Sequence, residues 1–361
     1  MQLWNKLNKE ELEHQLRDIG HEYVTISFYT YAKIANPSLF RDHLFVMWSK
    51  LDVVGRTYVA HEGINSQIAV PTKVLPEFRE QLYSIDFLNG IRLNYAVDEA
   101  EAEFPFLKLK IKVRNKILAD GLNDENFDVT NKGKHLNAEE FNKLTDDPET
   151  MLIDFRNHYE SEVGHFKGAI LPDVDTFRDS LPYIEETILK GNEEKNIVMY
   201  CTGGIRCEKA SAYFKHKGFK NVHQLEGGII KYAHDAKKQG LENKFIGKNF
   251  VFDERRGERI SDDIISVCHQ CGEPADTHTN CLNNACHLLF IQCDKCKDAF
   301  ENCCSNECQE IYNLPEEKQK ELRRGLNNSN QIFKKGRSEH LKYKSNKEKH
   351  ISLDTNKKTK K

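Results

Sequence analysis

The chain has 361 residues and a formal net charge of −3, and 39% of its residues are hydrophobic. This length allows two or three domains. No run approaches the roughly 18 apolar residues of a membrane span, which argues against a membrane protein or a membrane partner. The first residues, "MQLWNKLNKEELEHQL", lack the apolar core of a signal peptide. We therefore expect a cytoplasmic protein whose 11 cysteines are metal ligands or catalytic groups rather than disulfides.

Residues 23–97 predict six alternating elements. The expected strands are 23–30, 56–63, 64–70 and 91–97, and the expected helices are 37–51 and 72–84. The order βαββαβ is that of the ferredoxin-like α+β fold. No catalytic constellation appears in this segment, so we expect residues 1–103 to form a ferredoxin-like domain that serves recognition or acts as a scaffold.

A cationic strand is predicted at 106–114, after the acidic linker 98–103. Four apolar side chains alternate there with four cations, and a period of two places the cations on one face: Lys108, Lys110, Lys112 and Arg114. Such a face favours contacts to an RNA phosphate backbone. The alternative is a solvated face, or a sheet edge guarded against aggregation. Residues 104–130 are assigned to this basic connecting region.

Residues 131–245 show strands that alternate with helices, which predicts an α/β domain with a parallel sheet covered on both sides. Asn137 and Glu140 have the spacing of a capping box before a helix. The segments "MLIDFR", "NIVMY" and "NVHQL" predict strands, and "EKASAYFKHKG" predicts a helix. Ligands of such sheets bind at the carboxyl ends of the strands. Cys201 directly follows "NIVMY" and lies at such an end.

Cys201 is the candidate catalytic residue, since a thiolate is the reactive form of cysteine. The loop that follows it contains Thr202, Gly203, Gly204 and Arg206. Its backbone N–H groups, the start of the next helix and the guanidinium can together hold an anion and lower the pKa of the thiol. The alternative is an inert buried cysteine, which does not require a Gly-Gly-x-Arg loop.

The spacing Cys-x4-Arg is one residue shorter than the loop of cysteine phosphatases and suits sulfur better than phosphate. It resembles the rhodanese domain. The upstream segment "IDFRNHYESEVGHFKGAILP" is also similar to the rhodanese signature, with five residues in familiar places: Asp154, Arg156, Glu160, His165 and Gly168. Asp154 and Arg156 are therefore candidate supporting residues. Cys207 either resolves an oxidised Cys201 by forming a disulfide or only packs beside it.

Five motifs in this order, "HEGIN", "KLKIKVR", "CTGGIRCEKA", "FVFDER" and "CHQCGEPADTHTNC", resemble the bacterial tRNA uridine(34) hydroxylase family, a rhodanese-domain family. The resemblance covers roughly residues 1–312. It implies oxygen-dependent hydroxylation at C5 of the wobble uridine in the anticodon loop of tRNA. The product is 5-hydroxyuridine, the precursor of 5-methoxy- and 5-oxyacetic acid uridines. The resemblance also implies that Cys201 is essential and that molecular oxygen is the co-substrate.

Two further functions stay open at the level of sequence. One is a sulfurtransferase that carries a persulfide on Cys201, which the loop supports equally well. The other is a non-catalytic RNA-binding adaptor. The sequence contains no flavin or nicotinamide motif and indicates no protein partner.

Residues 246–315 form a cysteine-rich module with nine cysteines between 268 and 308. Two Cys-x2-Cys pairs predict one four-sulfur zinc site: Cys268, Cys271, Cys293 and Cys296. A second site draws on Cys281, Cys286 or His287, Cys303 or Cys304, and Cys308, and we assign it to Cys281, Cys286, Cys303 and Cys308. Structural zinc is the expected metal, and the alternatives are reduced thiols or an iron–sulfur cluster.

The segment 312–361 carries 15 Lys and Arg residues against 6 Asp and Glu residues. This difference leaves a net charge of −12 on the rest of the chain. A basic tail on an acidic body indicates a polyanionic partner. Because the segment combines high charge with low hydrophobicity, we expect residues 316–361 to be disordered.

Overall fold

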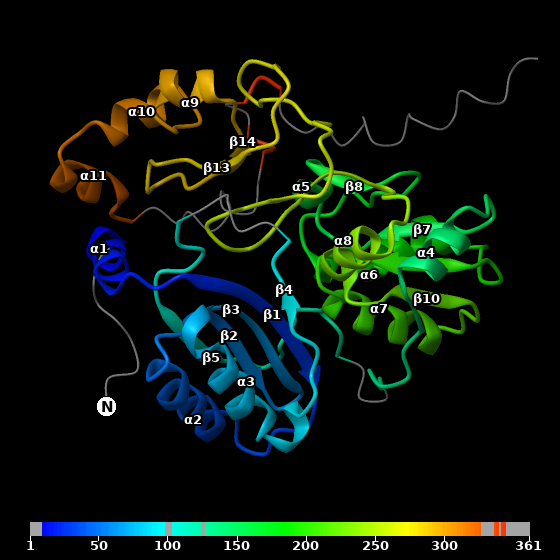
Figure 1. The fold of residues 1–361 in the computed structure, drawn as a ribbon. Coiled ribbons are helices and arrows are strands. Elements are labelled where there is room, and N and C mark those ends of the chain that lie inside the picture. Colours follow the sequence, from blue (N-terminus) through cyan, green and yellow to red (C-terminus); the bar gives the residue numbers. More distant parts are fainter. Residues whose placement is uncertain (1–8, 98–102, 124–126, 326–335, 339–340, 344–361) are drawn as a thin grey trace, which may run out of the picture.

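The computed structural model describes residues 9–97, 103–123, 127–325, 336–338 and 341–343. Figure 1 shows the N-terminal α+β part in blue and cyan, the central α/β part in green, and the cysteine-rich part in yellow and orange. None of the helices in these ranges is long and apolar enough to cross a membrane.

The N-terminal part confirms the order βαββαβ. Its elements are β1 (Tyr23–Tyr31), α2 (Pro37–Ser49), β2 (Val54–Ala60), β3 (Gly63–Pro71), α3 (Leu75–Tyr83) and β4 (Asn94–Tyr95). Helix α1 (Lys9–Ile19) precedes them, and short 3-10 turns span Thr72–Val74 and Asp86–Leu88. The sheet order is β4-β1-β3-β2-β5, in which β5 (Leu109–Val113) adds to the edge parallel to β2. The predicted cationic strand is therefore part of this sheet.

Only one face of this sheet is covered by its own helices. Trp48 of α2 and Phe78 of α3 are fully buried there, with ring centroids 5.6 Å apart. On β1, Ile26 and Phe28 join the same core, while Tyr29 points to the other face because successive side chains alternate. That other face turns toward the central part of the protein.

The central part is a parallel sheet with helices on both faces, as the sequence predicts. The sheet order is β6-β10-β9-β7, from β6 (Lys134–Leu136), β7 (Met151–Asp154), β9 (Ile197–Tyr200) and β10 (Val222–Leu225). The helices are α4 (Ala138–Thr145), α5 (His158–Ser161), α6 (Phe177–Tyr183), α7 (Ile205–His216) and α8 (Gly228–Gln239), with a π-helical turn at Ile184–Leu189. Asn137 and Glu140 form the predicted capping box. All four residues of β9 are buried, since both faces of this strand are covered.

The cysteine-rich part is joined to the central part by a shared sheet. Strand β11 (Phe245–Asn249) pairs with both β8 (Gly164–Phe166) and β12 (Glu258–Arg259). The remaining elements are β13 (His278–Asn280), β14 (Leu289–Ile291), α9 (Asp294–Phe300), α10 (Asn306–Tyr312) and α11 (Glu316–Arg323). Because β11 starts at Phe245, the sheet spans the expected domain boundary at 245/246.

The C-terminal segment differs in part from the expected disorder. Residues 316–323 form α11, Arg337 pairs with Asp173 and Asp175, and Leu341 is buried against the cysteine-rich core. The charges on α11 support its helix, since Lys320 lies one turn after Glu316 and pairs with it. The rest of the predicted tail (326–335, 339–340 and 344–361), like most of the acidic linker, lies outside the described residues.

Candidate active site

Cys201 follows β9 at the carboxyl end of the parallel sheet, and the loop after it turns directly into α7. Gly204 has a φ of +104°, a conformation that L side chains rarely adopt, and a Cβ there would lie 2.7 Å from the Tyr29 hydroxyl. A Cβ on Gly228 would lie 2.4 Å from the Cys201 carbonyl oxygen. Both glycines are required because other chain segments approach the loop so closely.

The Cys201 sulfur is fully buried and surrounded by donors. The Gly204 backbone N–H donates to it over 3.2 Å. Burial opposes ionisation, but the Cys207 thiol, the Arg206 charge and the N–H groups of Cys207 and Gly204 together lower the pKa of Cys201 to about 6. The thiolate is therefore the main form near neutral pH, as the loop sequence predicts.

Arg206 does not act as an isolated charge. Its two terminal nitrogens bind the two carboxylate oxygens of Glu160 at 2.6 and 2.8 Å, and one of them also donates to the Thr202 hydroxyl at 3.2 Å. The Arg206 guanidinium lies 6.0 Å from the centre of the Phe252 ring. Glu160 therefore neutralises much of the charge that the sequence analysis assigned to Arg206 alone, and it fixes the direction of the guanidinium.

Cys207 is buried beside Cys201. Burial and the hydrogen bond to Cys201 raise the pKa of Cys207 well above its ordinary value, so this residue stays a neutral donor. Its thiol is one of the groups that lower the pKa of Cys201. Whether it also forms a disulfide with Cys201 stays a prediction.

Asp154 and Arg156 lie behind the site rather than in it. Both side chains are completely buried, and Arg156 Nη2 binds Asp154 at 2.7 Å and the Gly164 carbonyl oxygen at 2.6 Å. The Arg156 guanidinium also lies 5.7 Å from the Tyr200 ring centre. This pair ties β7 to β8 and supports the end of the sheet on which the Cys201 loop rests.

A cavity of about 330 Å³ opens in front of Cys201. The loop residues Cys201, Thr202, Gly203 and Arg206 form one wall. The opposite wall comes from the uncovered face of the N-terminal sheet: Ser27, Tyr29, Arg56, Tyr58, Gln67 and Asn94. Phe252 also lines this cavity. The sequence predicted a recognition or scaffold role for the N-terminal domain but not that its sheet forms this wall, although the polar and aromatic face of β1 was a signal for it.

A buried ion-pair network fixes the two walls relative to each other. Lys209 on α7 is 2% exposed and binds Glu62 at 2.8 Å and also Asp120. Glu62, from the "HEGIN" motif, also accepts a hydrogen bond of 2.8 Å from the Ile117 backbone N–H. The "HEGIN" segment is thereby connected to the helix that starts at the Cys201 loop.

The cationic strand is brought together as predicted. Lys108, Lys110 and Lys112 line a second and larger cavity. The Arg114 guanidinium lies 5.5 Å from the centre of the Tyr58 ring. The pKa of Lys110 is lowered because of repulsion from Lys112, burial and repulsion from Lys108. The cations are therefore close enough to repel one another.

The cysteine-rich part contains two groups of four sulfurs that could hold a metal ion. One is the predicted set Cys268, Cys271, Cys293 and Cys296, and the other is Cys281, Cys286, Cys304 and Cys308. The second group contains Cys304 where the sequence analysis assigned Cys303. Cys303 is buried nearby, and its carbonyl oxygen accepts from Gln270 and Gln292.

The sulfur spacing in both groups fits a tetrahedral ion. Zinc–sulfur bonds of about 2.3 Å in a tetrahedron place sulfurs about 3.8 Å apart. The Cys271–Cys293 distance is 3.6 Å, and the Cys286–Cys304 and Cys304–Cys308 distances are both 3.7 Å. The four sulfurs of each group all lie within 4.8 Å of one another, so each group could hold a four-coordinate metal.

A thiolate in a Cys-x4-Arg loop at the end of a parallel strand defines a rhodanese-like protein, and residues 137–235 match the family model "Rhodanese-like domain". Residues 23–117 match "UPF0176 acylphosphatase like domain", and residues 246–309 match "Rhodanase C-terminal". Proteins named tRNA uridine(34) hydroxylase are similar over 336 residues: that of Photorhabdus laumondii is 52% identical and that of Yersinia pestis 53%. These alignments cover 93% of this chain and 95% and 94% of the relatives. The chain belongs to the tRNA uridine(34) hydroxylase family.

Proposed function

We propose that this protein hydroxylates C5 of uridine 34 in the anticodon loop of tRNA and uses molecular oxygen as co-substrate. The product is 5-hydroxyuridine, from which 5-methoxy- and 5-oxyacetic acid uridines derive. The observation that carries the proposal is that Cys201, with a pKa lowered to about 6, is one of the residues that line a 330 Å³ cavity. This volume lies within the range of about 300–1,000 Å³ that is typical of small-molecule sites. The name of the relatives, tRNA uridine(34) hydroxylase, supports hydroxylation of this uridine. We place the protein in the cytoplasm, where its substrate is found.

The role of Cys201 follows from the chemistry of uracil. C6 of the ring is electrophilic, so addition of the thiolate sulfur there makes C5 nucleophilic. C5 then gives two electrons to molecular oxygen and gains the hydroxyl group, the C5 hydrogen leaves as a proton, and the thiolate leaves C6. The N–H of Gly204 and the guanidinium of Arg206 lie beside the sulfur. They stabilise the thiolate before the addition and after its reversal.

The substrate base must leave the stack of the anticodon loop to reach this cavity. Enzymes that modify bases extrude them into a closed pocket, and backbone phosphates steer the approach. Lys108, Lys110, Lys112 and Arg114 are the proposed phosphate contacts, because they share one face of the sheet whose other strands line the Cys201 cavity.

Addition of the thiolate to C6 can be tested apart from oxidation. Because the adduct makes C5 exchangeable, the protein should exchange the C5 hydrogen of uridine 34 with deuterated water in the absence of oxygen. Cys201→Ala should abolish both this exchange and the formation of 5-hydroxyuridine in air, measured by nucleoside mass spectrometry. Lys220→Ala, at an exposed ion pair, is the control. Unchanged 5-hydroxyuridine in the Cys201→Ala protein would remove Cys201 from the mechanism.

Structural zinc is proposed for both sulfur groups. The four-thiol donor sets and their spacing favour zinc, which would stabilise a part of the chain that has few other core residues. Backbone N–H groups support this assignment, since those of Cys293, Cys271 and Gln270 lower the pKa of Cys268 to about 7 although burial opposes ionisation.

A persulfide carrier is the second candidate function, because the same amide cradle around Cys201 would stabilise a persulfide anion. Sulfur transfer from thiosulfate to cyanide by the purified protein, lost in Cys201→Ala, would favour it. Modification of uridine 34 that needs the protein but survives the loss of Cys201 would instead favour an RNA-binding adaptor.

A further inference from the structure

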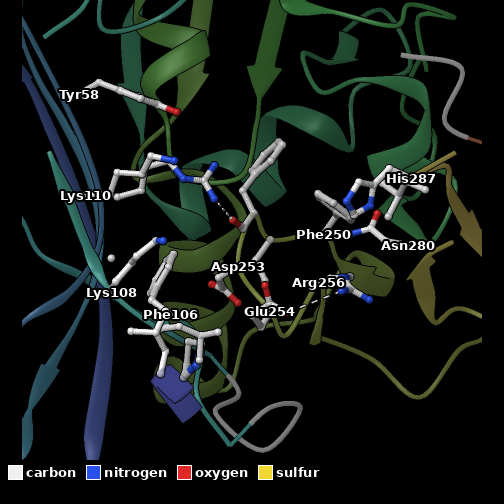
Figure 2. Close-up of a pocket in the computed structure, with 18 of the residues that line it drawn as sticks. Tyr58, Phe106, Lys108, Lys110, Phe250, Asp253, Glu254, Arg256, Asn280 and His287 are labelled. Carbon is white, nitrogen blue, oxygen red and sulfur yellow. Dashed lines mark hydrogen bonds and ion pairs between the residues drawn. The ribbon is translucent and has the colours of Figure 1, made fainter. Parts of the chain in front are cut away.

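A second cavity of about 620 Å³ lies between the N-terminal sheet, the "FVFDER" loop and the cysteine-rich part. In Figure 2, Tyr58, Lys108 and Lys110 line it from the sheet, while Asp253, Glu254 and Arg256 line it from the loop. Asn280 and His287 contribute from the cysteine-rich part. Three regions of the chain that are far apart in sequence thus build one cavity.

The cavity has a surplus of positive charge. Arg56, Lys108, Lys110 and Lys112 all line it, and none of them forms an ion pair with a carboxylate among the residues that the structure describes. The two carboxylates of the lining have cations of their own. Arg255 binds Asp253 at 2.6 Å, and Arg256 lies 3.7 Å from Glu254. The cations from the sheet therefore remain available to an anion that enters the cavity.

Aromatic rings are interleaved with these cations. Tyr58 and Phe252, which are partly exposed, line the cavity, whereas Phe106 and Phe250 beside them are buried. Single-stranded nucleic acid is held by this combination, because cations track the phosphates while aromatic faces stack with bases. A purely electrostatic contact with a folded RNA helix would not need the rings.

The second cavity adjoins the Cys201 cavity. Arg56, Tyr58 and Phe252 line both of them. Arg56 donates to the Phe252 carbonyl oxygen at 3.3 Å, and the other side of Phe252 carries the ring that faces Arg206. The two cavities thus share three lining residues, and one of them, Arg56, is a cation.

We propose that the 620 Å³ cavity seats a nucleotide next to the target uridine in single-stranded RNA, with the phosphate between the two nucleotides on Arg56. This inference rests on the proposed function and deepens it. Adjacent nucleotides of one strand occupy adjacent cavities, Lys108 and Lys110 bind the next phosphates, and the "FVFDER" loop separates the two bases. The cysteine-rich part then acts in substrate binding, because it completes the second cavity.

The test uses the full-length protein and an anticodon stem–loop RNA with uridine at position 34. Lys108→Ala/Lys110→Ala removes two cations of the cavity, and Lys237→Ala/Lys238→Ala removes two exposed cations at the end of α8 as the matched control. We expect the cavity variant to bind about tenfold more weakly. The slope of its log affinity against log salt concentration should become shallower by about 0.7 for each phosphate that it no longer neutralises. The control variant should bind like the wild type.

A second experiment tests which neighbour of uridine 34 places its base in the 620 Å³ cavity. RNAs with an abasic site directly before or directly after uridine 34 are compared. We expect one of them to weaken binding to the wild type by about threefold or more but not to weaken binding to Tyr58→Ala, whose stacking surface is already removed. The inference is wrong if the cavity variant binds the RNA as tightly as the control variant. It is also wrong if each abasic RNA changes binding to the wild type and to Tyr58→Ala by the same factor. If the variants show these binding effects but the wild-type protein makes no 5-hydroxyuridine, the proposed function is refuted. The inference that the 620 Å³ cavity binds a nucleotide of single-stranded RNA would then stand.

Discussion

Glu160 and Arg206 form a buried bidentate ion pair, at 2.6 and 2.8 Å, next to the Cys201 thiolate. The pair is built across 46 residues of sequence, from α5 to the first turn of α7. A full positive charge can lie in this closed site because the attraction of the bonded counter-charge offsets the desolvation cost. The thiolate thus depends on oriented donors as much as on net charge.

The pH dependence of Cys201 reactivity follows from its lowered pKa. The rate of alkylation by iodoacetamide should rise with pH, reach half of its maximum near pH 6 and level off above about pH 7, because only the thiolate reacts. Peptide mass spectrometry resolves Cys201 from the other cysteines. A rate that still rises steeply between about pH 8 and 9 would show an ordinary thiol.

The two members of the ion pair should shift the Cys201 pKa in opposite directions. Arg206→Gln removes a cation and should raise the pKa, while Glu160→Gln removes the anion that offsets Arg206 and should lower it further. Each single change leaves one buried charge unpaired and should destabilise the protein by about 3–5 kcal/mol.

The double variant separates stability from reactivity. Glu160→Gln/Arg206→Gln should regain part of the lost free energy of unfolding in urea but keep the raised Cys201 pKa. Shifts of the same sign in both single variants would contradict the opposing roles of the two charges.

Replacement of Cys207 tests its role as a donor. Cys207→Ala removes the thiol that donates to Cys201 and should raise the Cys201 pKa, while Cys207→Ser keeps a donor and should raise it less. The alkylation profile provides the measurement. A Cys201–Cys207 disulfide found after turnover, together with the absence of multiple turnovers in both variants, would establish the resolving role instead.

The buried Lys209 network should contribute strongly to stability. Lys209→Met leaves Glu62 and Asp120 without their shared cation and should cost about 3 kcal/mol or more in urea unfolding. Lys220→Met breaks an exposed pair with Glu194 and should cost less than about 1 kcal/mol. Equal effects would mean that the network does not hold the two walls of the cavity together.

Metal content distinguishes two adjacent cysteines. Purified protein should contain two zinc ions per chain, and Cys304→Ser should lose one of them while Cys303→Ser keeps both. Elemental analysis measures the content, and thermal unfolding should show a lower melting temperature for Cys304→Ser. Loss of one zinc ion in Cys303→Ser but not in Cys304→Ser would show that Cys303 is the ligand, as the sequence analysis expected.

Local periodicity determined much of this protein. The βαββαβ order, the buried strand before Cys201, the capping box at Asn137 and the Cys-x2-Cys pairs all depend on neighbours a few residues apart, so the sequence predicted them. Such patterns express backbone geometry, which acts over short range. The lowered pKa of Cys201 belongs with these features, because its donors lie within six residues of it.

Only the tertiary structure decided which distant groups meet. It placed the face of β1 that carries Tyr29 opposite Cys201, joined Lys209 to Glu62 across 147 residues, and chose Cys304 over Cys303. No period or spacing encodes these choices, since they depend on how whole elements pack and on which way a backbone turns. The sequence by itself determined the donors that lower the pKa of Cys201, and packing between the three parts determined the cavity that Cys201 lines.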